Sequence, residues 1–345
     1  MGERGSPTRR LSRQDARQGG GLGCGADPVE RGYSRRVSPA GVSSVVLGLS
    51  AVIVAVTGEQ PRLLTVGDGR AALPSGYLDP DGDRTLERAL RRWVREQTGI
   101  DLGYVEQLYS LGDRGRGPQE GERLVTVAYL ALVREGPVPD RAGARWRDFY
   151  SFLPWEDFRD GPQRALGGAI VPTLEGWVGA APEAAAREAR RERVQVMFGR
   201  RGSPWDVERV LERYELLFEA GLVPEAGGEE GPVPGEPMDL DHRRIAAQAL
   251  GRLRGKLRYR PVVFELLPPT FTLGRLQQVV EALSGVRLHS QNFRRLVNRG
   301  GLVEPTGEVD ASTGGRPAAV YRFRREVLRE RPAPGVGLPG LRTSG

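Results

Sequence analysis

The stretch that decides the fold is Leu73–Ile100, which reads LPSGYLDPDGDRTLERALRRWVREQTGI. Within it, Leu86, Leu90 and Val94 recur every four residues, so their side chains share one face of a helix. This spacing predicts a helix over 84–97. Proline, glycine and polar residues precede that helix, and a threonine and a glycine follow it. The stretch therefore indicates a loop, an amphipathic helix and a second loop.

This loop–helix–loop resembles the Nudix box, whose pattern is G-x5-E-x7-R-E-U-x-E-E-x-G-U, with U an apolar residue. The matching residues are Gly76, Arg92, Val94, Glu96, Gly99 and Ile100. The segment between the glycine and the arginine is two residues longer than the pattern. The resemblance implies a Nudix-like α/β fold, a mixed sheet with helices. The competing interpretation is an ordinary amphipathic helix that ends in EQTGI by chance.

Two positions depart from the box, because Trp93 and Gln97 stand where the family has glutamate. In that family, glutamates on neighbouring helical turns hold divalent cations against a diphosphate, which water then attacks. A neutral amide and an indole cannot replace carboxylate ligands. We therefore expect no catalytic residue, no metal site and no enzyme activity. Glu87, nine residues before Glu96, is expected to be able to share its face, which keeps a hydrolase alternative open.

Composition bounds the class of protein. The 345 residues allow two domains, and 39% hydrophobic residues are enough for real cores. The net charge of +7 permits an anionic partner. Residues 41–240 are acidic overall and the chain is basic from residue 241 on, which predicts two domains with different partners. Cys24 is the only cysteine, so an internal disulfide and a multi-cysteine metal site are excluded. This fits the reducing cytoplasm, where we expect the protein to be located.

One apolar run, GVSSVVLGLSAVIVAV over 41–56, has to be weighed as a membrane or signal segment. It is short for a spanning helix, which needs about 20 apolar residues. It is also rich in β-branched residues and leads directly into the polar turn TGEQPR. We expect a buried strand and no membrane association.

Other segments continue an alternation of strands and helices. Strands are expected at 45–56, 62–66, 104–110, 124–132 and 149–153, with a mobile polar loop before 124. The first two form a hairpin. Helices are expected at 181–198, 206–220 and 241–257. The histidines His242 and His289 are expected at helix ends or on the surface, and Trp155 and Trp205 in the core rather than stacked on an adenine.

The C-terminal region predicts a winged helix-turn-helix. An apolar stripe marks a helix over 271–283, which Thr270 or Thr272 can cap. A tight connection leads to a second helix over 289–298, in which Phe293, Leu296 and Val297 face inward. Strands at 303–308 and 319–324 complete a basic hairpin. The alternative is a solvated cationic face.

This region resembles the C-terminal half of Nudix-related transcriptional regulators of NAD metabolism. The motifs that carry the resemblance are FTL, NFRR and GRPAAVYRF, within residues 241–324. The resemblance implies a degenerate Nudix domain that binds a nucleotide effector, a winged helix that binds operator DNA, and a homodimer. The helical segment 182–226 is extra relative to the better-known members, which leaves the effector open among ADP-ribose, NAD and an ATP-like nucleotide.

The resemblance also sets the expected domains. They are a disordered tail (1–40), a Nudix-like effector domain (41–180), a helical insertion with a linker (181–237), a winged helix domain (238–330) and a second tail (331–345). The expected function is a repressor of NAD biosynthesis genes that requires no cofactor. The alternatives are a Mg²⁺-dependent hydrolase of ADP-ribose or a related nucleoside diphosphate, and an adaptor whose basic domain binds an acidic protein.

The candidate site residues fall into two groups. Candidates for effector binding are Arg70, Tyr77, Arg92 and Glu96, although Arg92 can instead bridge the box helix to its loop. Candidates for contact with double-stranded operator DNA are Ser290, Gln291, Asn292, Arg294, Arg295, Arg299, Arg316 and Arg322. Outward Ser, Gln, Asn and Arg side chains can read base edges, and Arg can also clamp phosphates.

Overall fold

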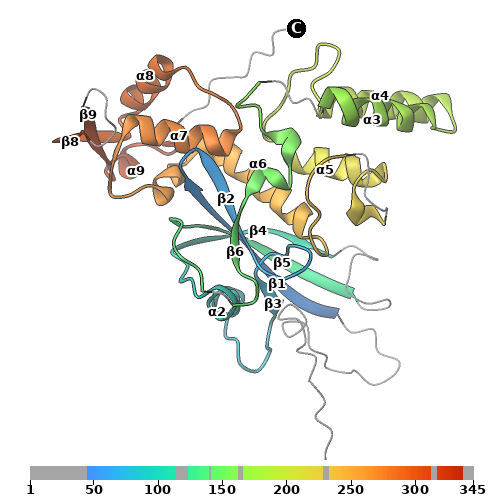
Figure 1. Cartoon of the computed structure of the whole chain (residues 1–345), viewed down its shortest axis with the longest axis horizontal. Coiled ribbons are helices and arrows are strands. Elements are labelled where there is room, and N and C mark those ends of the chain that lie inside the picture. Colours follow the sequence, from blue (N-terminus) through green and yellow to red (C-terminus); the bar gives the residue numbers. More distant parts are fainter. Residues whose placement is uncertain are drawn as a thin grey trace, which may run out of the picture.

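The computed structural model describes residues 45–112, 123–139, 141–161, 166–227, 233–311 and 317–336. A central sheet has helix α2 on one side and a layer of several helices on the other, and the C-terminal elements lie at one end of that layer (Figure 1). The tail expected at 1–40, most of the second tail and the polar loop expected to be mobile lie outside the described residues.

The sheet is mixed, as the resemblance implies. Its strands are β1 (Val45–Thr57), β2 (Gln60–Thr65), β3 (Ser75–Tyr77), β4 (Tyr104–Leu111), β5 (Arg123–Leu132) and β6 (Arg145–Asp148). Their order is β4-β5-β1-β2-β6, and β3 also pairs with β1. Strands β1 and β5 are parallel, and the other pairs are antiparallel. The expected hairpin is confirmed, with Thr57 opposite Gln60 at its turn.

Both faces of the central strand β1 are buried. The side chains facing α2 (Leu86–Thr98) are Leu49, Ala51 and Ile53, and those facing the opposite layer are Val52, Val54 and Val56. A strand covered on both faces needs apolar residues at consecutive positions, which explains the membrane-like run. No helix within the described residues is long and apolar enough to cross a membrane.

The last strand was predicted in the wrong place. Residues Phe149–Ser151 form a 3-10 helix, and the strand is the preceding β6. The side chain of Asp148 accepts a 3.0 Å hydrogen bond from the backbone N–H of Tyr150, which caps the turn and ends the strand. Phe149, Phe152 and Leu153 are fully buried around that turn, so their apolar character reflects packing and not a strand period.

The helical segment packs into the same core as the sheet. It contains a π-helical turn (Leu166–Ile170) and the helices α3 (Val171–Gly179), α4 (Ala184–Met197) and α5 (Val210–Glu219), followed by α6 (His242–Tyr259). One continuous cluster of buried residues extends from β1 through α5 and α6 to the C-terminal helices. Trp155 belongs to this cluster with no exposed surface, and Trp205 is 8% exposed, as expected for core residues.

The described ends of the Gly-, Pro- and Glu-rich segment before α6 are anchored. The backbone N–H of Glu236 donates to the carbonyl of Ser151 at 2.8 Å. Glu225 accepts from Arg243 at 3.3 Å, and both side chains are almost fully buried. These contacts fix the start of α6 against the sheet.

The C-terminal elements form a three-stranded sheet and two helices. They are β7 (Thr270–Thr272), α7 (Leu273–Ser284), α8 (Ser290–Gly300), β8 (Val303–Asp310), β9 (Ala318–Phe323) and the short α9 (Val327–Glu330), with sheet order β7-β9-β8. The predicted winged helix is confirmed. Thr272 caps α7 by accepting from the N–H of Arg275 at 3.2 Å, and α7 starts after β7 rather than at Phe271.

Candidate functional site

Helix α2 is held at both ends by its own sequence. The Thr85 hydroxyl accepts from the N–H of Arg88 at 3.2 Å, which satisfies one free donor at the helix start. Gly99 adopts a left-handed φ of 70° and closes the other end. Leu90 and Val94 are fully buried against the sheet. The opposite side of the helix therefore faces β3 and the loop that precedes α2.

Trp93 occupies the space above Gly76. A Cβ on Gly76 would lie 2.2 Å from the indole carbon Cδ2, so this position accepts no larger residue while Trp93 is there. The indole Nε1 donates to the backbone carbonyl of Tyr77 at 2.8 Å. Tyr77, a candidate for effector binding, thus contacts the box helix through its backbone. The indole binds helix α2 to β3 without any charge.

Gln97 is the second link between α2 and β3. Its side chain is 7% exposed. The amide Oε1 accepts from the N–H of Ser75 at 3.0 Å, and Nε2 donates to the Ser75 carbonyl at 2.8 Å. Only a group with both an acceptor and a donor can make this pair of bonds, and an ionised glutamate has no donor.

Arg92 bridges the helix to the preceding loop. Its guanidinium donates twice to the Asp83 carboxylate, at 3.2 and 2.8 Å, and lies 3.6 Å from Glu96. The hydrogen bonds with Asp83 raise the pKa of Arg92, and those with Arg92 lower the pKa of Asp83. This is the bridging role weighed for Arg92. Glu96 is half exposed beside it and open to solvent.

The expectation that Glu87 can share a face with Glu96 is wrong. At about 100° per residue, nine residues place two side chains on opposite sides of a helix. Glu87 instead pairs with Arg91, with Nε donating to Oε1 at 2.9 Å. Among the described residues, no group of three or more His, Cys, Asp or Glu side chains is arranged to hold a metal ion.

Arg70 lies away from the other three effector candidates, in a pocket that we call the arginine pocket. Its lining includes Arg62, Arg70, Arg145, Arg147, Trp146, Asp148, Ser151 and Glu236, and its volume is about 790 Å³. Arg147 pairs with Glu236, and Arg145 donates to the Gly67 carbonyl at 3.1 Å. Neither Tyr77, Arg92 nor Glu96 lines it. The candidates therefore occupy two places.

The sequence reasoning missed three of the four arginines in this pocket. Arg145 and Arg147 alternate in RWRD, a spacing that puts both side chains on one side of a strand. That signal was lost because the strand was expected four residues later. Arg62 comes from β2, which pairs with β6 from Arg62 opposite Asp148 to Thr65 opposite Arg145.

Both histidines lie where they were expected, His289 on the surface and His242 at the start of α6. His242 starts α6 but is only 2% exposed, and its Nδ1 accepts from the N–H of Leu73 at 3.1 Å. Burial lowers the pKa of His242 to about 4, so the ring is neutral at physiological pH. It thereby connects α6 to the residue that begins the Nudix-like stretch.

Helix α8 presents a polar and basic face. Phe293 and Val297 are fully buried against α7, and Leu296 is partly buried. The exposed side chains are the candidates Ser290, Gln291, Asn292, Arg294, Arg295 and Arg299, together with Asn298. In the described part of the chain, these three arginines form no ion pair. Among the described residues, Arg295 donates to the Asn292 side-chain oxygen at 3.4 Å.

The wing differs from α8. Arg322 on β9 is exposed but pairs with Glu304 on β8 at 2.6 Å, which compensates part of its charge. Arg324 donates to the Gly301 carbonyl at 2.9 Å and pairs with Glu330, so it holds the fold together. Arg316 lies outside the described residues. Within the described ranges, Arg322 and Arg324 of the wing are thus paired with carboxylates, whereas the exposed arginines of α8 are not.

The sheet domain and the C-terminal domain each match a known family model. Residues 47–174 match the NUDIX domain model, and residues 263–323 match the NrtR DNA-binding winged helix domain. The chain is 27% identical over 252 residues to the "ADPR responsive transcriptional repressor NtrR" of Acinetobacter baylyi. The aligned region covers 73% of this chain and 69% of that protein.

Two solved structures share the fold. Both are of Shewanella oneidensis NrtR, one without DNA and one complexed with a 27mer DNA, and each aligns with a TM-score of 0.50 and 22% identity. The alignment covers 81% of this chain for the structure without DNA and 82% for the complex, and 95% of the other chain in both cases. Fold and site thus define a Nudix-like domain joined to a winged helix DNA-binding domain. The protein is a homologue of the NrtR transcriptional regulators.

Proposed function

We propose that this protein is a repressor of NAD biosynthesis genes that binds operator DNA through α8 and responds to ADP-ribose or a related nucleotide. The observation that carries this proposal is the exposed face of α8 within a matched NrtR winged helix domain. Its Ser, Gln and Asn side chains suit base edges in the major groove, and Arg294, Arg295 and Arg299 suit phosphates. Arg322 and Arg316 of the wing are proposed backbone contacts.

The effector would bind the Nudix-like domain. The relative from Acinetobacter baylyi is described as ADPR-responsive. Four arginines line the arginine pocket, Arg62, Arg70, Arg145 and Arg147, and guanidinium forks bind phosphate oxygens bidentately. We propose that Arg70 contacts the diphosphate there, and that Tyr77, Arg92 and Glu96 contribute at the box helix. No cofactor is required.

We infer that the protein is not a Nudix hydrolase. Trp93 and Gln97 are neutral and are already bonded to β3, so neither can supply a carboxylate to a metal ion. Glu87 and Glu96 lie on opposite sides of α2. A bound nucleotide would therefore remain intact, which suits a sensor.

We further propose a cytoplasmic homodimer, in which residues 41–180 bind the effector, 238–330 bind DNA and 181–237 connect the two. Two-fold symmetry places two α8 helices on half-sites that are about 10 base pairs or a multiple apart. An effector that changes the spacing of these helices changes the affinity for the operator.

A mobility-shift assay with DNA from upstream of the gene tests the proposal. We expect sequence-preferring binding that weakens as salt is raised and changes when ADP-ribose is added. Binding that shows no sequence preference would contradict a repressor, and binding only to an acidic protein would favour the adaptor. Incubation of ADP-ribose with Mg²⁺ or Mn²⁺ tests the hydrolase alternative. Turnover that Glu96→Gln abolishes would show that the protein is an enzyme.

A further inference from the structure

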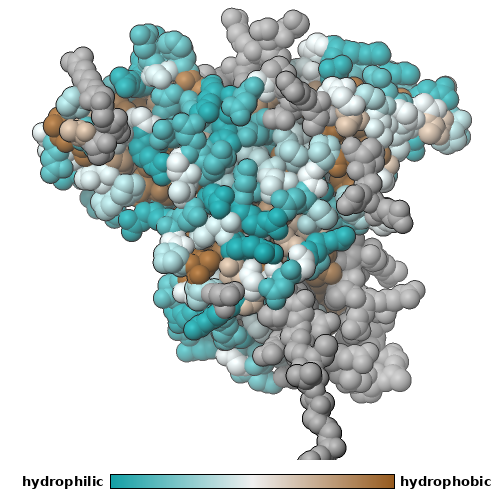
Figure 2. Space-filling view, viewed as in Figure 1, coloured by the Kyte–Doolittle hydropathy of each residue, from teal (hydrophilic) through white to brown (hydrophobic). Residues whose placement is uncertain are grey.

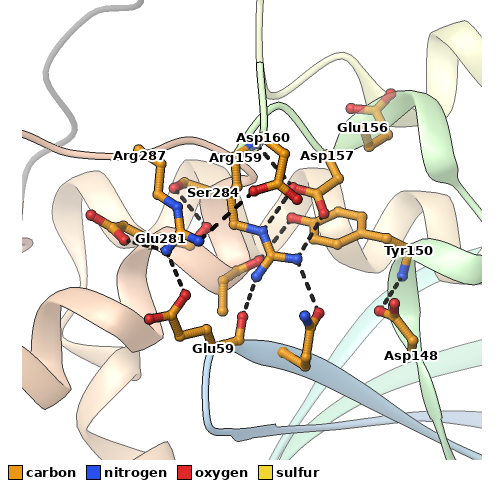
Figure 3. A network of polar contacts seen from close by, with 12 residues as sticks. Glu59, Asp148, Tyr150, Glu156, Asp157, Arg159, Asp160, Glu281, Ser284 and Arg287 are labelled. Atoms are coloured by element: carbon orange, nitrogen blue, oxygen red, sulfur yellow. Dashed lines mark hydrogen bonds and ion pairs between the residues drawn. The ribbon is translucent and has the colours of Figure 1, made fainter. Parts of the chain in front are cut away.

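The turn between β1 and β2 lies against the turn between α7 and α8 (Figure 3). The carboxylate of Glu59, at the tip of the β1–β2 hairpin, accepts a 2.7 Å hydrogen bond from Nη1 of Arg287. Arg287 stands between the end of α7 and the start of α8 and also bonds Glu281 at 3.2 Å. One arginine therefore connects the sheet to the turn of the helix-turn-helix.

A second arginine holds the same hairpin from the start of α7. Arg275 donates to the carbonyls of Gly58 at 2.7 Å and Val56 at 3.2 Å. These bonds involve backbone carbonyls at the hairpin tip, where the chain turns with Gly58 at a left-handed φ of 61°. The helix-turn-helix thus binds the tip at two places, the start of α7 and the turn after it. The buried Arg159 also holds the tip, through the Glu59 carbonyl and, at 3.0 Å, the Gln60 side chain.

Strand β2 of the same hairpin also borders the arginine pocket. Strand β2 carries Arg62, which lines that pocket, only three residues after Glu59. A strand is stiff over such a distance, because its backbone is bonded on both sides, here to β1 and β6. A displacement of β2 at the pocket therefore also moves the hairpin tip.

The contact between the tip and the helix turn is a weak one. The side chains of Glu59 and Arg287 are 43% and 46% exposed. The hydrogen bond with Arg287 lowers the pKa of Glu59, so the carboxylate is ionised at neutral pH. Exposed ion pairs contribute little to stability, because water and salt screen them. The contact can therefore form and break within the folded protein, unlike the fully buried contact of Glu156 with Arg254 in the same region.

We propose that the β1–β2 turn couples a ligand in the arginine pocket to the position of α7 and α8, with Glu59 and Arg275 as its two contacts. In the docked state both contacts are made. A phosphate group that draws Arg62 from the Trp146 carbonyl, to which its Nη2 donates at 2.9 Å, moves β2 and loosens both contacts, while Arg159 and the buried bonds at the end of α7 hold. This inference rests on the proposed function, because it needs both a ligand and DNA as partners.

The test compares full-length variants by one ratio, the dissociation constant for operator DNA with ADP-ribose divided by that without it. Glu59→Gln and Arg275→Ala each remove one contact. Glu219→Gln is the matched control, because Glu219 forms an equally exposed pair with Arg193 at 2.6 Å, far along the chain in α5. We expect the ratio to move toward one by about two- to fivefold in the two test variants and to match the wild type in the control.

Two further measurements separate the outcomes. ADP-ribose affinity without DNA is expected to stay within about twofold of wild type, since neither residue lines the pocket. An unchanged ratio in both test variants would overturn the coupling role and leave the proposed function standing. A wild-type protein whose DNA affinity does not respond to ADP-ribose would overturn both.

Discussion

Trp93 and Gln97, where the sequence predicts a departure from the Nudix box, hold α2 to β3. The indole covers Gly76 and bonds the carbonyl of Tyr77, while the amide pairs with both backbone groups of Ser75. The side of α2 that faces β3 is therefore neutral at these two positions and is packed against the strand. Restoring the carboxylates is expected to cost stability rather than to create an enzyme.

Replacing Gln97 by Glu tests this at one position. The carboxylate can accept from the Ser75 N–H but leaves the Ser75 carbonyl without a donor. We expect the free energy of unfolding to fall by about 1–3 kcal/mol, measured by urea denaturation. Gln107→Glu, at an exposed position of β4, is the control and is expected to change little. Equal stability of the two variants would argue against the backbone pairing.

His242 makes stability depend on pH. Its folded pKa of about 4 is below the unfolded value near 6.5, so only the unfolded state binds a proton between these values. The stabilisation is complete above about pH 6.5 and is lost as the pH falls toward 4, by on the order of 3 kcal/mol. His242→Asn should remove this component from unfolding measured across that range, and His289→Asn should not. The same pH slope in His242→Asn and wild type would refute the assignment.

At the scale of elements, α8 differs from the other basic helices in having no counter-charges. In α4, Arg193 pairs with Glu219 and Arg191 with Glu188, whereas Arg294 and Arg295 of α8 form no ion pair within the described residues. Unpaired cations on one helix face favour a polyanion, because binding releases counterions from it. The helix thus has both the charge and the exposed amides that operator recognition needs.

The double variant Arg294→Ala with Arg295→Ala is expected to weaken DNA binding and to lower its salt dependence. Each lost phosphate contact reduces the slope of log K against log salt by about 0.9, so two contacts give about 1.8. Fluorescence anisotropy at several salt concentrations measures this slope. Arg200→Ala with Arg201→Ala, an exposed adjacent pair outside the winged helix, should leave it unchanged. An unchanged slope in the α8 variant would exclude these phosphate contacts.

At the scale of the whole molecule, one buried carboxylate joins the parts. Glu156 accepts from Arg213 of α5 at 2.6 and 2.9 Å and from Arg254 of α6 at 2.6 Å, with all three side chains fully buried. Burial alone raises the pKa of Glu156, but the two arginines outweigh it and keep the pKa below its usual value. Arg254 also donates to the Leu283 carbonyl at the end of α7. The face of the molecule seen in Figure 2 is largely hydrophilic, with smaller hydrophobic patches.

Glu156→Gln is expected to destabilise the entire protein. It leaves two buried guanidiniums without a counter-charge, and breaking a buried ion pair costs about 3–5 kcal/mol. The free energy of unfolding from chemical denaturation measures the loss, and Glu219→Gln, which breaks an exposed pair, should cost at most about 1 kcal/mol. Similar losses in the two variants would contradict the central role of Glu156.

Local patterns in the sequence were sufficient for most elements. The spacing of Leu86, Leu90 and Val94, the glycine at position 99 and the apolar run of β1 each act within one element, so helix, cap and strand could be predicted. Two expectations failed. Phe149–Leu153 is apolar because it packs in the core and not because it is a strand, and the turn of the helix places Glu87 away from Glu96. The face of α8 was predictable because Phe293 and Val297 mark its buried side.

By itself, the sequence determined that a Nudix-like domain precedes a basic winged helix, and it predicted that Trp93 and Gln97 stand in place of two glutamates of the box. Only the tertiary structure decided what took their place, because the bonds of Gln97 to Ser75 join segments 22 residues apart. It also gathered Arg62, Arg145 and Arg147 beside Arg70, which no local pattern shows. Such contacts depend on how strands pair and helices pack, and those arrangements arise from the whole chain folding around one core.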